Sequence, residues 1–205
     1  MSKARREHAA AVGVAENGNS AVLVTITQRE LIDRRSIDLT KGLPTHPYHH
    51  EGSWAVGRYL NAPWARATTL AEAVTLVTRV REAAARGARE SLDALAASLS
   101  VPIASIAVRE CPTLPPTTEA IIADARAASM ADSALYREAL ARAAEARGWS
   151  VYWYDRERVS REAAALLGDE DLDALLRAMG KAVGPPWTAK HKLAAAAALA
   201  AGSRK

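Results

Sequence analysis

The stretch AAAVGVAENGNSAVLVTITQRELIDRRSIDL, residues 9–39, decides how the chain begins to fold. It contains three runs that are either apolar and β-branched or alternately apolar and polar, a pattern typical of strands. These runs are residues 9–15, 21–27 and 31–39. Two short turns, Asn17-Gly18-Asn19 and Gln28-Arg29-Glu30, separate them. Because turns this short join antiparallel neighbours, we expect one antiparallel unit of three strands.

Helices and strands alternate beyond this unit. The strongest helical pattern begins at a capping box of Thr69 and Glu72 and continues to Leu99. Further elements are expected as a strand at 103–108, a helical stretch at 118–147 interrupted near 129–133, a strand at 149–154, and helices at 159–167, 169–179 and 188–201. The order βββαβαβα predicts an α/β fold with a mixed five-stranded sheet and helices on both faces.

Length and composition indicate a single domain with one core. The chain has 205 residues, of which 49% are hydrophobic and 24% charged, and its formal net charge is +4. We expect residues 1–8 to be disordered and 40–63 to form a long loop. No apolar run reaches the ~18 residues of a membrane span, no signal peptide is evident, and the single Cys111 favours a reducing compartment. These features predict a cytoplasmic protein without a membrane partner.

The element order resembles the ribonuclease H-like superfamily, which includes Holliday-junction resolvases. The closing stretch GPPWTAKHKLAAAAALAA, residues 184–201, is similar to the alanine-rich last helix of resolvase-type members. Together with LPTHPYHHEG (43–52) and SALYREALARAAEARGW (133–149), it is also similar to a group of bacterial proteins without an assigned function. The first resemblance implies two-metal phosphodiester chemistry with Mg²⁺ or Mn²⁺, held by carboxylates on the first strand, the fourth strand and the last helix.

Only part of that carboxylate set is present. Ala15 stands where the first acid is expected, and the alternation of a strand turns the neighbouring Glu16 to the other face. Glu110 matches the second acid, at the end of the fourth strand. The last helix has His191 and no carboxylate after Thr188. An exposed strand-end residue is the plainer interpretation of Glu110, and a two-metal nuclease is disfavoured.

A histidine-rich loop and the start of the last helix are the other candidate sites. His46, His49, His50 and Glu51 have a spacing suited to metal ligation, and Glu110 and His191 are their expected partners in a rearranged catalytic site. The same loop could equally pack over the sheet. Lys190 and Lys192 lie at a helix N-terminus, where free backbone N–H groups favour an anion such as phosphate. An alanine-rich helix can also tolerate such cations without any ligand.

Two further patterns bear on function. Neither glycine-rich phosphate-binding motif, GxGxxG or GxxxxGK[ST], occurs. The aromatic strand at 149–154 could stack nucleic-acid bases, although on a central strand such residues belong to the core.

Three functions therefore stay open. The first is a catalytically degenerate ribonuclease H-like accessory factor that binds nucleic acid or a protein partner. The second is a metal-dependent nuclease or phosphodiesterase that uses His49, Glu51, Glu110 and His191. The third is a self-associating structural protein that forms a homo-oligomer.

Overall fold

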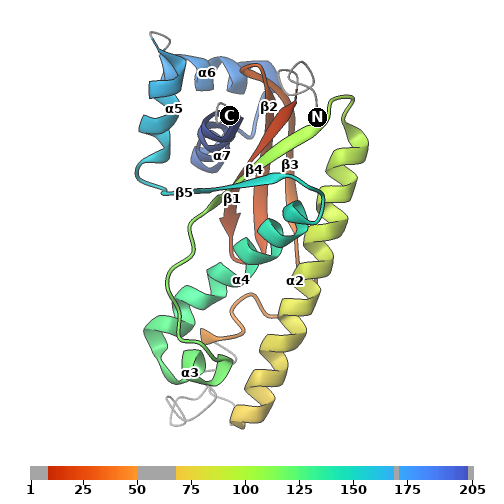
Figure 1. Ribbon diagram of the computed structural model, residues 1–205, viewed down its shortest axis with the longest axis vertical. Helices are drawn as coiled ribbons and strands as arrows, with labels where there is room; N and C mark the ends of the chain where they lie inside the picture. The colour runs from red at the N-terminus through yellow and green to blue at the C-terminus, as the bar shows by residue number, and fades with distance from the viewer. Residues whose placement is uncertain (1–8, 50–67, 169–170, 203–205) are drawn as a thin grey trace.

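The computed structural model describes residues 9–49, 68–168 and 171–202 and confirms the predicted α/β fold class. A five-stranded sheet has the order β3-β2-β1-β4-β5 (Figure 1). Its strands are β1 (Ala10–Asn17), β2 (Ser20–Thr27), β3 (Glu30–Asp38), β4 (Ile103–Arg109) and β5 (Ser150–Tyr154). The first three are antiparallel, while β4 and β5 run parallel to β1. The sheet is therefore mixed, as the element order predicts.

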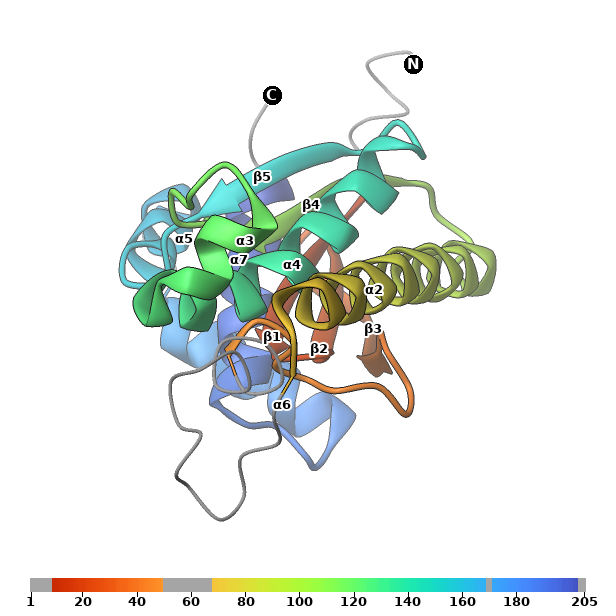
Figure 2. The same ribbon diagram turned by 90° about the horizontal axis from the view of Figure 1, so that it is seen from below.

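Helices cover both faces of this sheet. On one face lie α2 (Leu70–Ser98) and α4 (Ala125–Glu145), which pack side by side, with the short α3 (Thr118–Ala123) beyond them (Figure 2). On the other face α7 (Ala189–Gly202) packs on β1, β2 and β4, next to α5 (Val159–Leu167) and α6 (Leu172–Val183). No helix in the described ranges is long and apolar enough to cross a membrane.

The β1–β2 turn and the first cap follow local sequence rules, whereas the β2–β3 turn places two non-glycine residues at positive φ. Gly18 has a φ of 59° in the β1–β2 turn, and Gln28 and Arg29 have φ of 47° and 69° in the β2–β3 turn. The capping box forms as expected: the Thr69 hydroxyl accepts the N–H of Glu72, and the Glu72 carboxylate accepts the N–H of Thr69.

The predicted interruption at 129–133 is wrong. The chain breaks earlier, at Asp124, and α4 continues through 129–133 without interruption. The Asp124 carboxylate accepts the N–H groups of Arg126 and Ala127 and so starts a new helix there.

The aromatic strand lies at the edge of the sheet, and its expected central position is wrong. β5 pairs only with β4 within the described chain. Its Tyr154 is buried and donates a hydrogen bond to the Val14 carbonyl at 2.7 Å, whereas Trp153 is 37% exposed. An edge strand has a partner on one side only, so part of this aromatic run stays in contact with solvent.

The two faces are packed differently. The β1 residues Val12 and Val14 join a core of large side chains from α2 and α4, while Ala11 and Ala15 meet the alanines of α7. Gly13 allows α7 its close approach, because a Cβ there would lie 1.7 Å from the Ala194 carbonyl oxygen. The expected disorder of 1–8, most of the 40–63 loop and the start of the 169–179 helix fall outside the described residues.

Candidate functional site at the carboxyl edge of the sheet

The direction of the side chains at the end of β1 determines whether an acidic residue of this strand can face α7. The register between β1 and β2 is continuous from Ala11 to Asn17, so no bulge alters the alternation there. Ala15 consequently faces α7 and is buried among its alanines. Glu16 points toward α4, as the alternation predicts. At this end of β1, the side chain that faces α7 is therefore the methyl group of Ala15.

Glu16 is held in a buried ion pair. Its Oε1 atom accepts from Nε of Arg137 at 2.7 Å and lies 2.5 Å from Nη2, and both side chains are 7% exposed. A second guanidinium, that of Arg109, lies 3.9 Å from the same oxygen. Nη1 of Arg137 also donates to the Glu110 carbonyl at 2.9 Å. Arg137 thereby links the carboxyl ends of β1 and β4 and forms an ion pair with Glu16, the one acidic residue of β1.

Glu110 lies directly after β4. Its N–H donates to the Tyr154 carbonyl at 3.0 Å, which extends the β4–β5 pairing by one residue. The Glu110 side chain is exposed, and the neighbouring Cys111 is half-buried, so burial raises the pKa of its thiol. A deprotonated nucleophile at Cys111 is correspondingly disfavoured.

His191 is buried in the first turn of α7. Its Nδ1 atom accepts the N–H of Thr188 at 3.2 Å and lies 2.9 Å from the Thr188 hydroxyl. The ring packs 5.6 Å from the Trp187 ring. Burial, together with the charge of Arg34, lowers the pKa of His191, so the imidazole is neutral at pH 7. Lys190 and Lys192 on the same turn are exposed.

The histidine-rich loop packs on α4. The Asp132 carboxylate accepts the N–H of Tyr48 at 2.8 Å and that of His49 at 3.3 Å, and His46 Nδ1 lies 3.7 Å away. Burial raises the pKa of Asp132 to about 7, although the two N–H donors oppose that shift. Asp132 is not among the residues predicted from the sequence. The pattern that could have identified it is an acidic residue among the apolar positions along one side of an alanine-rich helix. His50 and Glu51 lie outside the described residues.

The candidate residues therefore occupy three separate places. Glu110 contacts β5 and α4, whereas His191 is close to Arg34 on β3, and β1 and β2 lie between β4 and β3. His49 is bound to α4, on the face of the sheet opposite α7. The structure does not bring His49 and His191 together, and the catalytic role of the set stays a prediction.

Solved structures of the same architecture exist. The structure described as T. thermophilus RuvC in complex with Holliday junction substrate matches with a TM-score of 0.50 and 16% sequence identity, over 94% of this chain and 92% of that one. The chain has the ribonuclease H-like fold. A second structure, of Thermus thermophilus RuvC, has a TM-score of 0.47 and 14% identity over 93% and 92% of the two chains. No family model and no curated protein matches the sequence.

A ribonuclease H-like fold implies a pair of divalent metal ions, and the described residues do not fit them. Such ions need several carboxylate oxygens at one place. Here the β1 acid is bound by Arg137, and α7 contributes no carboxylate. Within the described ranges no group of three His, Cys, Asp or Glu side chains could hold a metal.

Proposed function

We propose that this protein is a catalytically degenerate ribonuclease H-like accessory factor that binds nucleic acid at the carboxyl edge of its sheet. The observation that carries the proposal is the Glu16–Arg137 ion pair. Where the fold normally gathers metal-binding carboxylates, a guanidinium neutralises the acid of β1. The attraction for phosphate oxygens then comes from the exposed guanidinium of Arg109 beside this pair, without an intervening metal ion.

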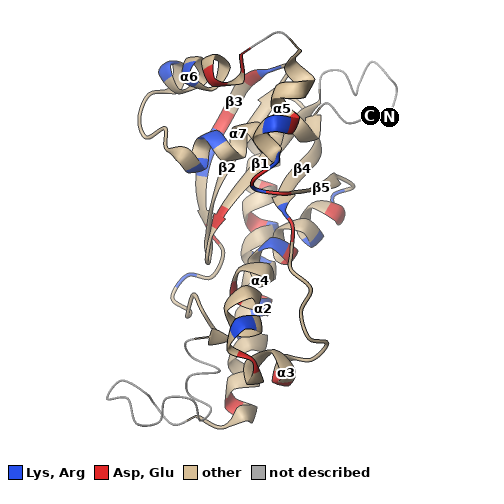
Figure 3. Cartoon of the chain, turned by 90° about the vertical axis from the view of Figure 1, so that its left-hand side faces the viewer, with Lys and Arg blue, Asp and Glu red and all other residues tan. Residues whose placement is uncertain are grey.

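Exposed cations around this pair support phosphate binding. Arg109, at the end of β4, has a side chain that is 38% exposed, and Arg156 follows β5 in the turn before α5. The first turn of α7 carries two further exposed cations, Lys190 and Lys192, on the β3 side of the sheet near Arg34. Figure 3 shows basic and acidic residues interspersed along the helices and strands. Binding through a few phosphates, rather than through a wide basic coat, follows from that distribution.

Branched DNA is the first ligand to test, because the RuvC structure of similar fold was determined with a Holliday junction substrate. Labelled single-stranded, double-stranded and branched DNA, and RNA, would be incubated with the protein and Mg²⁺ or Mn²⁺. Native and denaturing gels would be run together. We expect a mobility shift without cleavage. Metal-dependent cleavage that a chelator abolishes would refute the degenerate assignment.

Charge reversal at the first turn of α7 tests the contact itself. The double variant Lys190→Glu/Lys192→Glu should weaken binding at least about 5-fold. The slope of the log binding constant against log salt concentration should become shallower by about two, because about two phosphate contacts are lost. Arg79→Glu/Arg86→Glu carries the same charge change on exposed positions of α2, on the other face of the sheet, and is the matched control. Equal binding by the two double variants would show that α7 makes no phosphate contact.

The same gels distinguish the alternative functions. If cleavage occurs and Glu110→Gln abolishes it, the rearranged site of His49, Glu51, Glu110 and His191 is the correct assignment. If neither shift nor cleavage occurs with any nucleic acid, the accessory role must instead involve a protein partner or a second copy of this chain.

A further inference from the structure

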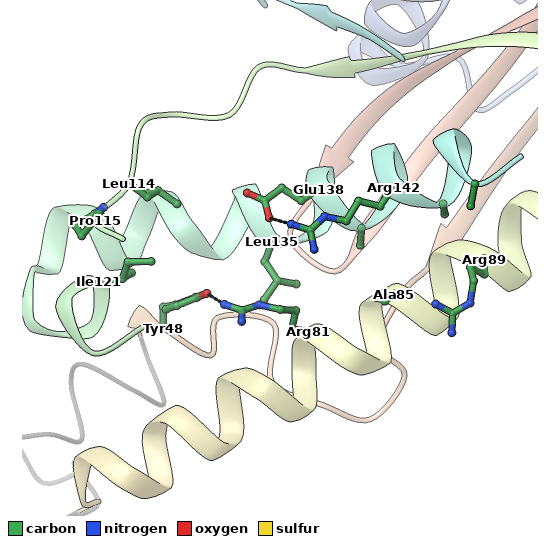
Figure 4. Close-up of a pocket in the computed structure, with 13 residues that line it drawn as sticks. Tyr48, Arg81, Ala85, Arg89, Leu114, Pro115, Ile121, Leu135, Glu138 and Arg142 are labelled. Carbon is green, nitrogen blue, oxygen red and sulfur yellow. Dashed lines mark hydrogen bonds and ion pairs between the residues drawn. The ribbon is translucent and has the colours of Figure 1, made fainter. Parts of the chain in front are cut away.

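A pocket of about 330 Å³ lies between α2 and α4, away from the carboxyl edge (Figure 4). Helix residues from both elements form its walls, and the segment after β4 and α3 close one end. The residues that line it and enter the argument below are Tyr48, Arg81, Ala85, Arg89, Leu114, Ile121, Leu135, Glu138 and Arg142. Its volume falls within the range of small-molecule sites.

One end of the pocket is apolar. Ile121 of α3 and Leu135 of α4 are 7% and 5% exposed, and Leu114 packs beside them from the segment that follows β4. The aromatic ring of Tyr48 forms part of the same end. Figure 4 shows Leu114, Ile121 and Tyr48 at the end of the pocket nearest α3, with Leu135 farther along, beside Arg81. An apolar group of a ligand would be desolvated here at little cost.

The remainder of the pocket is cationic. Three guanidinium groups, of Arg81, Arg89 and Arg142, line it together with one carboxylate, that of Glu138. Arg81 is oriented by a 2.5 Å hydrogen bond to the Tyr48 hydroxyl. Arg142 and Glu138 lie 3.6 Å apart but are 75% and 45% exposed, so their attraction is weak. The Arg89 side chain forms no ion pair with any described residue. The lining therefore carries an excess of positive charge.

We propose that this pocket binds a small amphipathic anion. Its apolar part lies against Leu114, Ile121 and Leu135, and its carboxylate or phosphate is bound by Arg142, while the positive charge of Arg89, farther along α2, adds to the attraction (Figure 4). Guanidinium groups bind both anions through paired N–H donors, which makes arginine more suitable than lysine at such a position. The site lies on the face of the sheet opposite α7 and is independent of nucleic-acid binding.

The test uses three ligands that share one apolar chain. Octyl phosphate, octanoate and octan-1-ol would each be titrated into the full-length protein by calorimetry. We expect the two anions to bind at least about 10-fold more tightly than the alcohol. Arg89→Glu and Arg142→Glu should each weaken anion binding at least about 5-fold. Arg79→Glu, on the same helix as Arg89 but outside the pocket, is the matched control and should change nothing.

A second variant tests the apolar pocket separately from its charges. Ala85→Phe places an aromatic ring into the pocket from a half-buried position of α2 and should abolish binding of all three ligands. Circular dichroism would confirm that each variant is folded. The proposal is overturned if neither anion binds, if the alcohol binds as tightly as the anions, or if Arg89→Glu and Ala85→Phe leave anion binding unchanged.

Discussion

The two faces of the sheet use opposite kinds of packing. On the α7 face, a row of alanines lies against Ala11, Gly13 and Ala15, so the backbones of α7 and β1 come close together. On the α2–α4 face, larger side chains such as Leu92 and Tyr136 are buried among alanines, and the polar groups of Glu16 and Asp132 are buried there with partners.

This difference explains why no carboxylate of β1 faces α7. A carboxylate on the α7 face of β1 needs space between strand and helix, and the close contact at Gly13 leaves none nearby. The acid of β1 lies on the other face, where there is room for a long arginine beside it. Close packing of the α7 and β1 backbones leaves no space for a buried charged side chain on that face. The buried ion pair of β1 therefore lies on the opposite face of the sheet.

The largest expected effect is on the polar face. Arg137→Met should lower the free energy of unfolding by about 3–5 kcal/mol, because Glu16 would remain as a buried charge without a partner. Urea unfolding at pH 7 measures this loss. Arg142→Met, on the same helix but 75% exposed, is the control and should cost below about 0.5 kcal/mol. Adding Glu16→Gln to Arg137→Met should restore most of the stability, and a failure to do so would show that Arg137 acts mainly through Glu110.

The close contact on the alanine face is tested next. Gly13→Ala should destabilise the protein by about 1–3 kcal/mol or more, because α7 must move away from β1 to admit the new methyl group. Gly202→Ala adds a methyl group to the same interface, 3.3 Å from the Cβ atom of Ala11, where a small shift suffices. If urea unfolding gave equal losses of unfolding free energy for the two variants, Gly13 would not be needed for the close approach of α7 to β1.

The buried Asp132 makes stability depend on pH. Its pKa is about 7 in the folded protein and about 4 in an unfolded chain, so the folded state retains the proton longer as pH rises. The free energy of unfolding should therefore fall between about pH 4 and pH 7 and become level above that range. Asp132→Asn should remove this slope, whereas Asp173→Asn on the exposed side of α6 should leave it. Parallel pH profiles for wild type and Asp132→Asn would contradict the assignment.

The smallest expected effects come from two tyrosines. Tyr154→Phe removes the hydrogen bond to the Val14 carbonyl, and Tyr136→Phe removes a 2.9 Å bond to the Thr45 carbonyl. Each change should cost about 1 kcal/mol in thermal unfolding. Hydrogen exchange distinguishes the two: only Tyr136→Phe should increase exchange of the amides of Tyr48 and His49, which lie in the loop that Tyr136 holds. Increased exchange in both variants would mean that the two faces are coupled.

Local patterns predict most of the elements. The strands begin and end within about two residues of their expected limits, and the Thr69–Glu72 capping box forms. Strand alternation alone also predicts that Glu16 faces away from α7. These features depend on side chains within a few positions of one another, so they can be read along the chain.

Errors occur where an isolated residue or a distant partner decides the outcome. A single carboxylate, that of Asp124, moves the helix break away from 129–133. The aromatic strand is an edge strand because it pairs with β4 alone among the described strands, and periodicity within the strand does not reveal its place in the sheet order.

The sequence by itself determined the order of strands and helices, the ribonuclease H-like fold class and the direction of the β1 acid. Tertiary structure alone decided which groups meet: Arg137 reaches Glu16 across 121 residues, and Asp132 binds the Tyr48 N–H across 84. It also formed the pocket between α2 and α4. The physical reason is that periodicity and caps act over one or two turns, whereas ion pairs, burial and cavities depend on elements that only folding brings into contact.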